Sequence, residues 1–292
     1  MKKIILVLAT ICLFVTLATI VSAIEIPTNV TVDYDPIVST ILLTDSDAGT
    51  LQIWANDSRT FNCTGVVTDN DGFADIQAVN ATIWGFNSTF AGADSAGVHY
   101  TNTSCTKFGG SGNTSSFNCA FTVQHNTQNG TWTCNVSVND TYARSATNQT
   151  TNTVDVFKSI SVPLQTIQFG AYAHSQNSGT VDKNVTVNNT GNVKFNISID
   201  AYRSSGIPAD NNSMTCASGT LPVSSIVYSV NPGVTALSKT ALVDAPTIIS
   251  ANVSVTPFGS LIPVSYSFYL GIIIPATNAS GACSGFLDVS AI

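Results

Sequence analysis

Residues 130–138 read Gly-Thr-Trp-Thr-Cys-Asn-Val-Ser-Val, and from the first Thr onward polar and apolar side chains alternate. In a β-strand, successive side chains point to opposite faces of the sheet. One face would therefore carry Trp132, Cys134, Val136 and Val138. The other face carries only Thr, Asn and Ser. The segment predicts a strand with one buried and one solvated side.

The last four residues of this stretch belong to a recurring pattern, Asn-Val-Thr/Ser-Val. It occurs at residues 29–32, 135–138, 184–187 and 252–255. Each copy is an N-glycosylation sequon as well as an alternating strand. Asn and Thr/Ser would share the wet face, where a glycan can sit, and the two Val residues would share the buried face. The pattern indicates how the chain is built and where it resides, but it names no reaction.

The composition favours an all-β fold. Good helix formers are scarce: the chain has ten Lys and Arg, two Met, and a single Glu, Glu25. Val, Ile, Thr, Ser, Asn and Gly dominate, which favours strands joined by turns. The length of 292 residues suits about two domains. We expect two tandem β-sandwiches, the first at residues 24–158 and the second at residues 163–292.

The N-terminus has the pattern of a secretory signal peptide at residues 1–23. Lys2 and Lys3 form a basic start, the run 4–20 is almost wholly apolar, and residues 21–23 end in small side chains. The alternative is an uncleaved anchor, because the apolar run is long for a signal. We expect an extracellular or cell-surface protein, with membrane attachment only if the segment is retained.

The net charge argues against a nucleic-acid partner. Removal of the signal leaves eight Lys and Arg against seventeen Asp and Glu, a formal charge of −9. Nucleic-acid binding normally needs a basic stripe. The expected partners are N-linked glycans and either other cell-surface proteins or further copies of this chain.

Short apolar runs separated by turn residues predict the strands. In the first half they cover residues 24–32, 50–54, 59–68, 78–86, 117–124, 130–139 and 151–161. In the second half they cover residues 164–169, 181–188, 194–202, 223–230, 247–256, 263–274 and 283–292. Such regular spacing is typical of a sandwich.

Six cysteines remain after the signal, four in the first half and two in the second. Even numbers in a secreted chain indicate disulfides. The second half allows only Cys216–Cys283, whereas the first half allows three pairings. We favour Cys63–Cys134, which would join two sheets across a long loop, together with Cys105–Cys119, which would close a short Gly-rich excursion.

The first half resembles an immunoglobulin-like domain over residues 30–157. Cys63 lies on an alternating strand, Trp84 lies on a later strand, and Trp132 precedes Cys134 by two residues. In the immunoglobulin fold a Cys pair bridges the sheets and a Trp packs on it. Trp84 is a candidate for that Trp or for another core aromatic. Trp132 replaces the Tyr that forms the tyrosine corner in that fold.

Four segments are similar to secreted archaeal surface proteins with immunoglobulin-like domains. They are residues 67–76, 130–136, 179–193 and 283–285. The resemblance implies a cell-surface location more than an activity, because the function of those proteins is mostly unassigned.

Seventeen sequons are candidate glycosylation sites, a strong excess over chance. They start at Asn29, Asn56, Asn62, Asn80, Asn87, Asn102, Asn113, Asn129, Asn135, Asn139, Asn148, Asn184, Asn188, Asn196, Asn211, Asn252 and Asn278. The alternative is that Asn-Val-Thr is simply a frequent pattern for a solvent-facing strand.

A calcium site is a candidate at Asp69-Asn70-Asp71-Gly72 with Asp75 nearby. Asp69, Asp71 and Asp75 would supply the hard oxygen ligands that Ca²⁺ prefers. The alternative is a simple Asx turn, which has the same residues for backbone reasons. Asp45 and Asp47 form a second, weaker candidate for a calcium site. No other cofactor is expected.

We expect no enzyme, because the three His residues fall in no recognisable catalytic motif. The leading hypothesis is a coat, stalk or filament subunit, in which residues 24–32 pair with an open sheet edge of a neighbour. The alternative is an adhesin or ligand-binding module that uses loops at the sandwich ends. Its binding loop would be residues 87–116, with His99, Tyr100 and Phe108.

Overall fold

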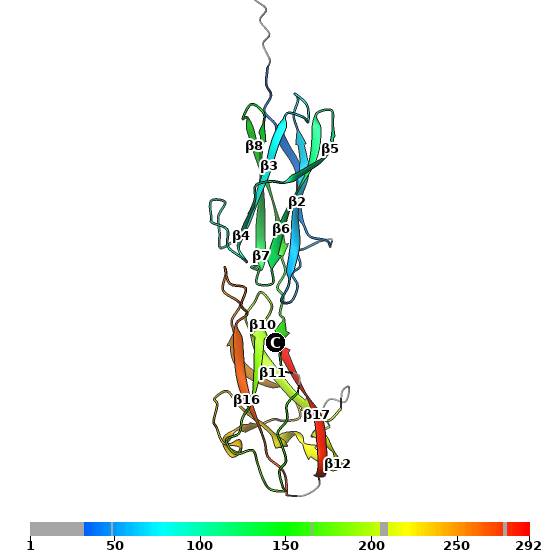
Figure 1. Cartoon of the computed structure of the whole chain (residues 1–292), viewed down its shortest axis with the longest axis vertical. Coiled ribbons are helices and arrows are strands. Elements are labelled where there is room, and N and C mark those ends of the chain that lie inside the picture. The colour runs from blue at the N-terminus through cyan, green and yellow to red at the C-terminus, as the bar shows by residue number, and fades with distance from the viewer. Residues whose placement is uncertain (1–31, 48, 165, 205–209, 277–278) are drawn as a thin grey trace, which may run out of the picture. The chain divides into compact units, whose positions relative to one another are not determined.

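The computed structural model describes residues 32–292, apart from residues 48, 165, 205–209 and 277–278. The expected signal peptide and nearly all of the expected first strand, residues 24–32, lie outside the described residues. The described chain is all-β, with antiparallel sheets and two short 3₁₀ turns (Figure 1). In this described part no helix has the length and apolar character needed to cross a bilayer.

Two four-stranded sheets form the first half. Their strands are β1 (Ile37–Thr44), β2 (Ser58–Thr68), β3 (Ile76–Gly85), β4 (His99–Asn102), β5 (Thr106–Ser111), β6 (Thr114–Gln124), β7 (Gly130–Asp140) and β8 (Ser145–Val154). One sheet has the order β1-β2-β6-β5 and the other has the order β4-β3-β7-β8 (Figure 1).

This strand order is that of an immunoglobulin-like sandwich. In that fold one sheet holds strands A, B, E and D, the other holds C, F and G, and a disulfide joins B to F. Here β1, β2, β6 and β5 take the A, B, E and D places, and β3, β7 and β8 take the C, F and G places. The disulfide between β2 and β7 has the B–F position. The predicted fold class is confirmed.

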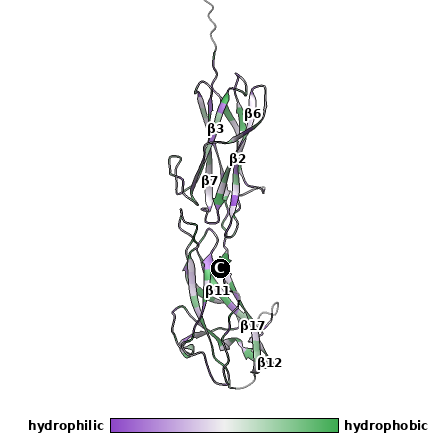
Figure 2. Cartoon of the chain, viewed as in Figure 1, coloured by the Kyte–Doolittle hydropathy of each residue, from purple (hydrophilic) through white to green (hydrophobic). Residues whose placement is uncertain are grey.

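Alternating side chains build the core of the first sandwich. On β7 the buried residues are Trp132, Cys134, Val136 and Val138, as the alternation predicts. Figure 2 shows hydrophobic and hydrophilic positions side by side along strands such as β2 and β7. The Trp ring contacts Phe61 edge-on, with ring centroids 6.4 Å apart, and its Nε1 donates to the carbonyl of Gln128 at 2.7 Å.

Trp84 does not take the place of the immunoglobulin core Trp. It is only partly buried and contacts Phe90 rather than the disulfide. Its strand neighbour Ile83 is fully buried and pairs directly with Cys134 across β3 and β7. Because side chains alternate, a Trp one residue further along the strand must face the other way.

The second half contains two further sheets. Its strands are β9 (Ile160–Ser161), β10 (Lys183–Asn189), β11 (Phe195–Tyr202), β12 (Asn212–Pro222), β13 (Ile226–Ser229), β14 (Thr240–Ala241), β15 (Thr247–Val253), β16 (Ser265–Ile272) and β17 (Ala279–Ala291). The 3₁₀ turns are η1 (Val223–Ser225) and η2 (Ala236–Ser238). The sheet orders are β14-β13-β16-β10-β9 and β12-β17-β11-β15.

A separate hydrophobic core lies between these two sheets, with Ile197, Ile199, Phe268 and Leu270 among its most buried members. The second set of strands begins at Ile160, slightly before the start expected at residue 163. Four expected strands differ from the structure. Residues 50–54 form only a single bridge at Leu51, and residues 164–169 form no described strand. Residues 151–161 divide between β8 and β9, and residues 223–230 divide between η1 and β13.

Candidate cation site and modification sites

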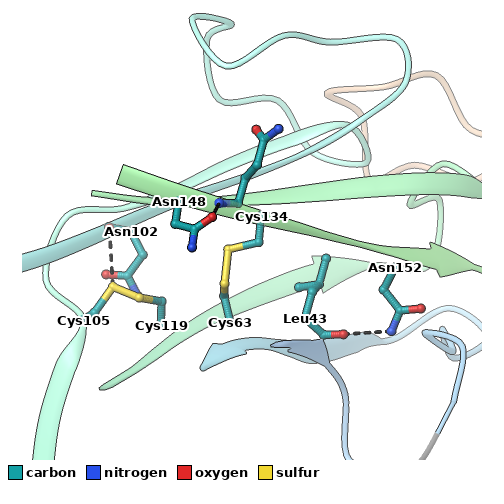
Figure 3. The surroundings of a disulfide bond; sticks show 9 residues. Leu43, Cys63, Asn102, Cys105, Cys119, Cys134, Asn148 and Asn152 are labelled. Atoms are coloured by element: carbon teal, nitrogen blue, oxygen red, sulfur yellow. Dashed lines mark hydrogen bonds between the residues drawn. A yellow bond between two sulfur atoms is a disulfide. The ribbon is translucent and has the colours of Figure 1, made fainter. Parts of the chain in front are cut away.

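Three disulfides join the pairs that the sequence favours. Cys63–Cys134 connects β2 to β7 and therefore links the two sheets of the first sandwich (Figure 3). Cys105–Cys119 ties the segment before β5 to β6. Cys216–Cys283 joins directly opposed positions on β12 and β17.

Asparagine side chains hold the edge strands of the two sheets together near the first disulfide. Asn152 on β8 donates from Nδ2 to the carbonyl of Leu43 on β1 at 2.8 Å (Figure 3). Asn148 donates from Nδ2 to the carbonyl of Val38 at 2.9 Å. These bonds cross from one sheet to the other, so this edge of the sandwich is closed by side-chain amides as well as by the core.

The described sequon asparagines all reach solvent. Seven are exposed: Asn56, Asn87, Asn113, Asn148, Asn184, Asn211 and Asn252. Eight are half-buried: Asn62, Asn80, Asn102, Asn129, Asn135, Asn139, Asn188 and Asn196. The buried asparagines of the described residues are Asn126, Asn189 and Asn192, and none of these three begins a sequon. Asn29 and Asn278 lie outside the described residues.

Not every exposed sequon has a free amide. A glycan is attached at Nδ2, so a side chain whose Nδ2 holds the fold together is a poorer acceptor. The Nδ2 of Asn148 bonds to Val38, and that of Asn102 bonds to the carbonyl of Ala120 at 3.0 Å. In its hydrogen-bonded orientation, the Asn80 amide nitrogen also donates to the carbonyl of Thr103 at 2.6 Å. We therefore expect less glycosylation at Asn80, Asn102 and Asn148 than at exposed sequons whose amide forms no such bond.

The three aspartates predicted as calcium ligands do converge. Asp69, Asp71 and Asp75 each offer a carboxylate oxygen, and these oxygens lie within 4.8 Å of one another. They belong to the turn between β2 and β3, where the N–H of Gly72 donates to the carbonyl of Asp69 at 3.1 Å. Gly72 has a φ of 111°, a value that favours glycine, so the turn needs a residue without a side chain there.

Asp140 is a fourth carboxylate at this cluster, and the sequence analysis missed it. It is the last residue of β7 and is fully buried. Its carboxylate oxygen lies within 4.8 Å of one from Asp75. The sequence signal that could have identified it is its position two residues after the buried Val138, because alternation along β7 places it on the buried face. We refer to Asp69, Asp71, Asp75 and Asp140 as the acidic cluster.

The acidic cluster concentrates negative charge around the buried carboxylate of Asp69. Burial raises the pKa of Asp69, and the nearby carboxylates of Asp75, Asp71 and Asp140 raise it further. A hydrogen bond from the N–H of Asp71 to Asp69 Oδ1, 2.9 Å long, acts in the opposite direction. The arrangement favours a positive charge at this position.

Asp45 and Asp47 have a different role. The guanidinium of Arg59 lies between them, with its Nη2 3.4 Å from Asp45 Oδ2 and 2.5 Å from Asp47 Oδ2. Arg59 also stacks over the ring of Trp54, with its Cζ 5.2 Å from the ring centroid. A protein cation already compensates these two carboxylates, so the weaker calcium candidate is an ion pair.

The loop expected at residues 87–116 contains strands β4 and β5 and the start of β6. His99 and Tyr100 belong to β4, His99 is fully buried, and Tyr100 stacks on Trp132 with ring centroids 6.1 Å apart. Phe108 on β5 is exposed, as expected. His99 and Tyr100 therefore contribute to packing rather than to an exposed binding loop, because β4 pairs with β3 and adds to the sheet.

The second sandwich contains an apolar cavity of about 1020 Å³. Its lining includes Phe169, Tyr172, Met214, Ile274 and Leu287, which are only partly buried. A space of this size and character can accept an apolar side chain or a small apolar ligand.

The comparisons assign no family to this chain. No family model and no curated protein matches it. Among solved structures, the dimeric latent PorU from Porphyromonas gingivalis matches with 14% identity and a TM-score of 0.28, over 91% of this chain and 21% of that one. The secreted serine protease VesC from Vibrio cholerae matches with 10% identity and a TM-score of 0.20, over 86% of this chain and 50% of that one. This chain thus spans about a fifth of the length of PorU and about half of the length of VesC.

Proposed function

We propose that this chain is a secreted, N-glycosylated and disulfide-stabilised structural protein of a cell surface, without catalytic activity. Its role would be that of a coat, stalk or filament subunit. The observation that carries the proposal is the distribution of asparagines: described sequons reach solvent, whereas the buried asparagines lie outside sequons.

The disulfides support the same proposal. All six cysteines beyond the expected signal are paired, and such pairs form and persist in oxidising compartments. With only 9% charged residues, the surface depends on hydroxyls and amides for solvation. Glycans on the exposed sequons would add to that solvation and would shield the exposed strands from association.

Peptide mapping of protein from its native host should find glycans at several sequons. We expect occupancy at Asn56, Asn87, Asn113, Asn184, Asn211 and Asn252, because these side chains are exposed. We expect little at Asn102 and Asn148, because their Nδ2 atoms bond to backbone carbonyls. The same chain made in a host without this modification provides the reference mass. Native protein with the bare polypeptide mass would contradict the proposal.

Assembly should depend on residues 24–32 if the chain is a filament or coat subunit. Deletion of these residues is expected to abolish ordered assemblies in electron microscopy while the unfolding of the two sandwiches stays unchanged. The reason is that an alternating strand can pair with an open sheet edge of a neighbour. Assemblies of unchanged order after the deletion would contradict this prediction.

The alternative function, an adhesin or ligand-binding module, is favoured by the apolar cavity of the second sandwich. Electron microscopy of the native cell surface separates the two proposals. Regular arrays of this protein would support the structural role, whereas sparse labelling together with ligand binding would support the alternative.

A further inference from the structure

Two members of the acidic cluster lie at the ends of the strands that carry the first disulfide, β2 and β7, which belong to opposite sheets. Asp69 lies six residues after Cys63, and Asp140 lies six residues after Cys134. Side chains alternate with a period of two, so an even separation returns each aspartate to the core face of its strand. The burial agrees, since both aspartates are fully buried. β2 and β7 thus direct two cysteines toward each other inside the sandwich, and at its end they direct two buried aspartates toward the carboxylate of Asp75.

Buried carboxylate oxygens in the cluster lack partners. Asp140 Oδ1 accepts the N–H groups of Tyr142 and Arg144 at 2.9 and 2.8 Å. Its Oδ2 is buried and has no hydrogen-bond donor among the described residues, and the same is true of Oδ2 of Asp69 and of Asp75. A buried unpaired polar group costs free energy, and an unpaired buried charge costs much more. A bound cation would compensate these oxygens, because it coordinates acceptor atoms and offsets their negative charge.

The spacing of the oxygens suits one large divalent cation. Oxygens that bind the same Ca²⁺ at about 2.4 Å lie at most about 4.8 Å apart. The carboxylates of Asp69, Asp71 and Asp75 satisfy this limit mutually. Asp140 satisfies it in a second group, with Asp75 and Asp33, so its carboxylate lies beside the first three rather than among them. Asp71 is exposed, so one side of the cluster is open to solvent and offers an entry path and room for bound water.

Two basic side chains near the cluster have partners of their own. Lys107 Nζ donates to the carbonyls of Ile76 and Gln77. Arg144 Nη1 lies 3.6 Å from Asp35 Oδ1, and both of these side chains are more than half exposed. These two cationic groups contact atoms at the edge of the cluster. None of these contacts reaches the buried Oδ2 atoms of Asp69 and Asp140.

We propose that Asp69, Asp71 and Asp75 bind one divalent cation of the calcium class beside the buried carboxylate of Asp140, and that this ion cross-links the two sheets of the first sandwich. Asp69 follows β2 in one sheet, whereas Asp75 precedes β3 and Asp140 ends β7 in the other. The ion would join the sheets at the end of the sandwich, as the Cys63–Cys134 disulfide joins them further inside. This inference is independent of the proposed surface role.

Calcium titration of the full chain after treatment with a chelator tests the proposal. Extracellular calcium modules bind with dissociation constants of about 0.1–1 mM, so about 10 mM calcium should raise the melting temperature by roughly 3–10 °C. Equilibrium dialysis should find about one bound calcium per chain. Sodium chloride at matched ionic strength serves as the reference for simple screening of charges.

Variants distinguish a cation site from ordinary packing. Asp69→Asn should lose the calcium response, and Asp140→Asn should weaken it by removing a neighbouring negative charge. Without calcium, both variants should melt at or above the wild-type temperature, because each removes repulsion inside the cluster. Asp71→Asn, at an exposed position, should weaken calcium binding without affecting folding. Asp57→Asn, an exposed acid in the same sandwich, is the matched control and should respond like wild type.

The proposal is overturned if calcium and matched sodium chloride give equal shifts, if no calcium remains bound on dialysis, or if Asp69→Asn keeps the full response. An equal shift with magnesium and one bound magnesium would overturn the assignment to calcium.

Discussion

Removal of the Cys63–Cys134 disulfide by a double substitution to Ala should lower the free energy of unfolding of the first sandwich by at least about 4 kcal/mol. The bridge spans 71 residues, and the chain-entropy model gives about 4 kcal/mol for a loop of this length. Both cysteines are fully buried beside Phe61 and Trp132, so the lost sulfur atoms also leave a packing defect. Since Trp54, Trp84 and Trp132 all lie in this half, Trp fluorescence in urea measures the change.

The matched control is the double substitution of Cys105 and Cys119. This bridge spans only 14 residues, for which the same model gives about 3 kcal/mol, and Cys105 is only partly buried. The Cys105/Cys119 variant should therefore be the more stable of the two. A reversed order would mean that the short bridge, and not the link between the sheets, dominates the stability of this sandwich.

Substitution of Asp182 by Ala should destabilise the second sandwich by about 3–5 kcal/mol, because it leaves a buried ammonium without its partner. Lys239 Nζ lies 2.6 Å from Asp182 Oδ1, and the lysine side chain is fully buried. Asp182 Oδ2 also accepts the N–H of Gly233 at 2.5 Å. Far-UV circular dichroism in urea should show the loss, whereas the Trp fluorescence transition should stay in place, because the second half has no Trp.

Two further measurements separate charge from packing at this pair. Adding Lys239→Met to Asp182→Ala should recover much of the loss, since the uncompensated charge is removed. If the double variant recovers no stability, the Asp182 carboxylate stabilises the fold through its hydrogen bond from the N–H of Gly233 and not through the lysine charge.

The pH dependence of the same pair follows from its pKa. Burial alone would raise the pKa of Asp182, but the hydrogen bonds from Lys239 and Gly233 and the lysine charge together lower it. The unfolded chain therefore binds the proton more tightly than the folded protein does. The stabilisation is fully present above the ordinary aspartate pKa of about 3.9 and is lost as the pH falls through the lower folded value. The difference between wild type and Asp182→Ala should shrink below about pH 4.

Strands with strong alternation were predictable from the sequence. β2, β3, β6, β7 and β16 all fall where the period of two is clear. β8 was poorly predicted because Ser-Ala-Thr-Asn-Gln-Thr-Thr-Asn-Thr-Val contains almost no apolar residue. As a largely exposed edge strand, it is held by backbone bonds to β7 and by the Asn148 and Asn152 amides, not by an apolar face.

Only part of the cation site was predictable. The turn that carries Asp69, Asp71 and Asp75 is a local feature, so its residue types identified it. Asp140 lies 71 residues beyond Asp69, and only the pairing of β3 with β7 brings it to the same turn. Likewise, Asp45 and Asp47 have a similar local pattern, but a distant side chain, Arg59, compensates their charge.

The sequence by itself determined the all-β fold, the faces of its clearest strands and the cysteines that pair, because alternation and cysteine number are properties of the local chain. Tertiary structure alone decided that Trp132 and not Trp84 fills the core, that His99 packs inside, and that a fourth carboxylate joins the turn. The physical reason is that these outcomes depend on which strands become neighbours. The stretch at residues 130–138 predicts which of its own side chains are buried. Which residues those side chains contact depends on its neighbours, β2 across the core and β3 in the same sheet.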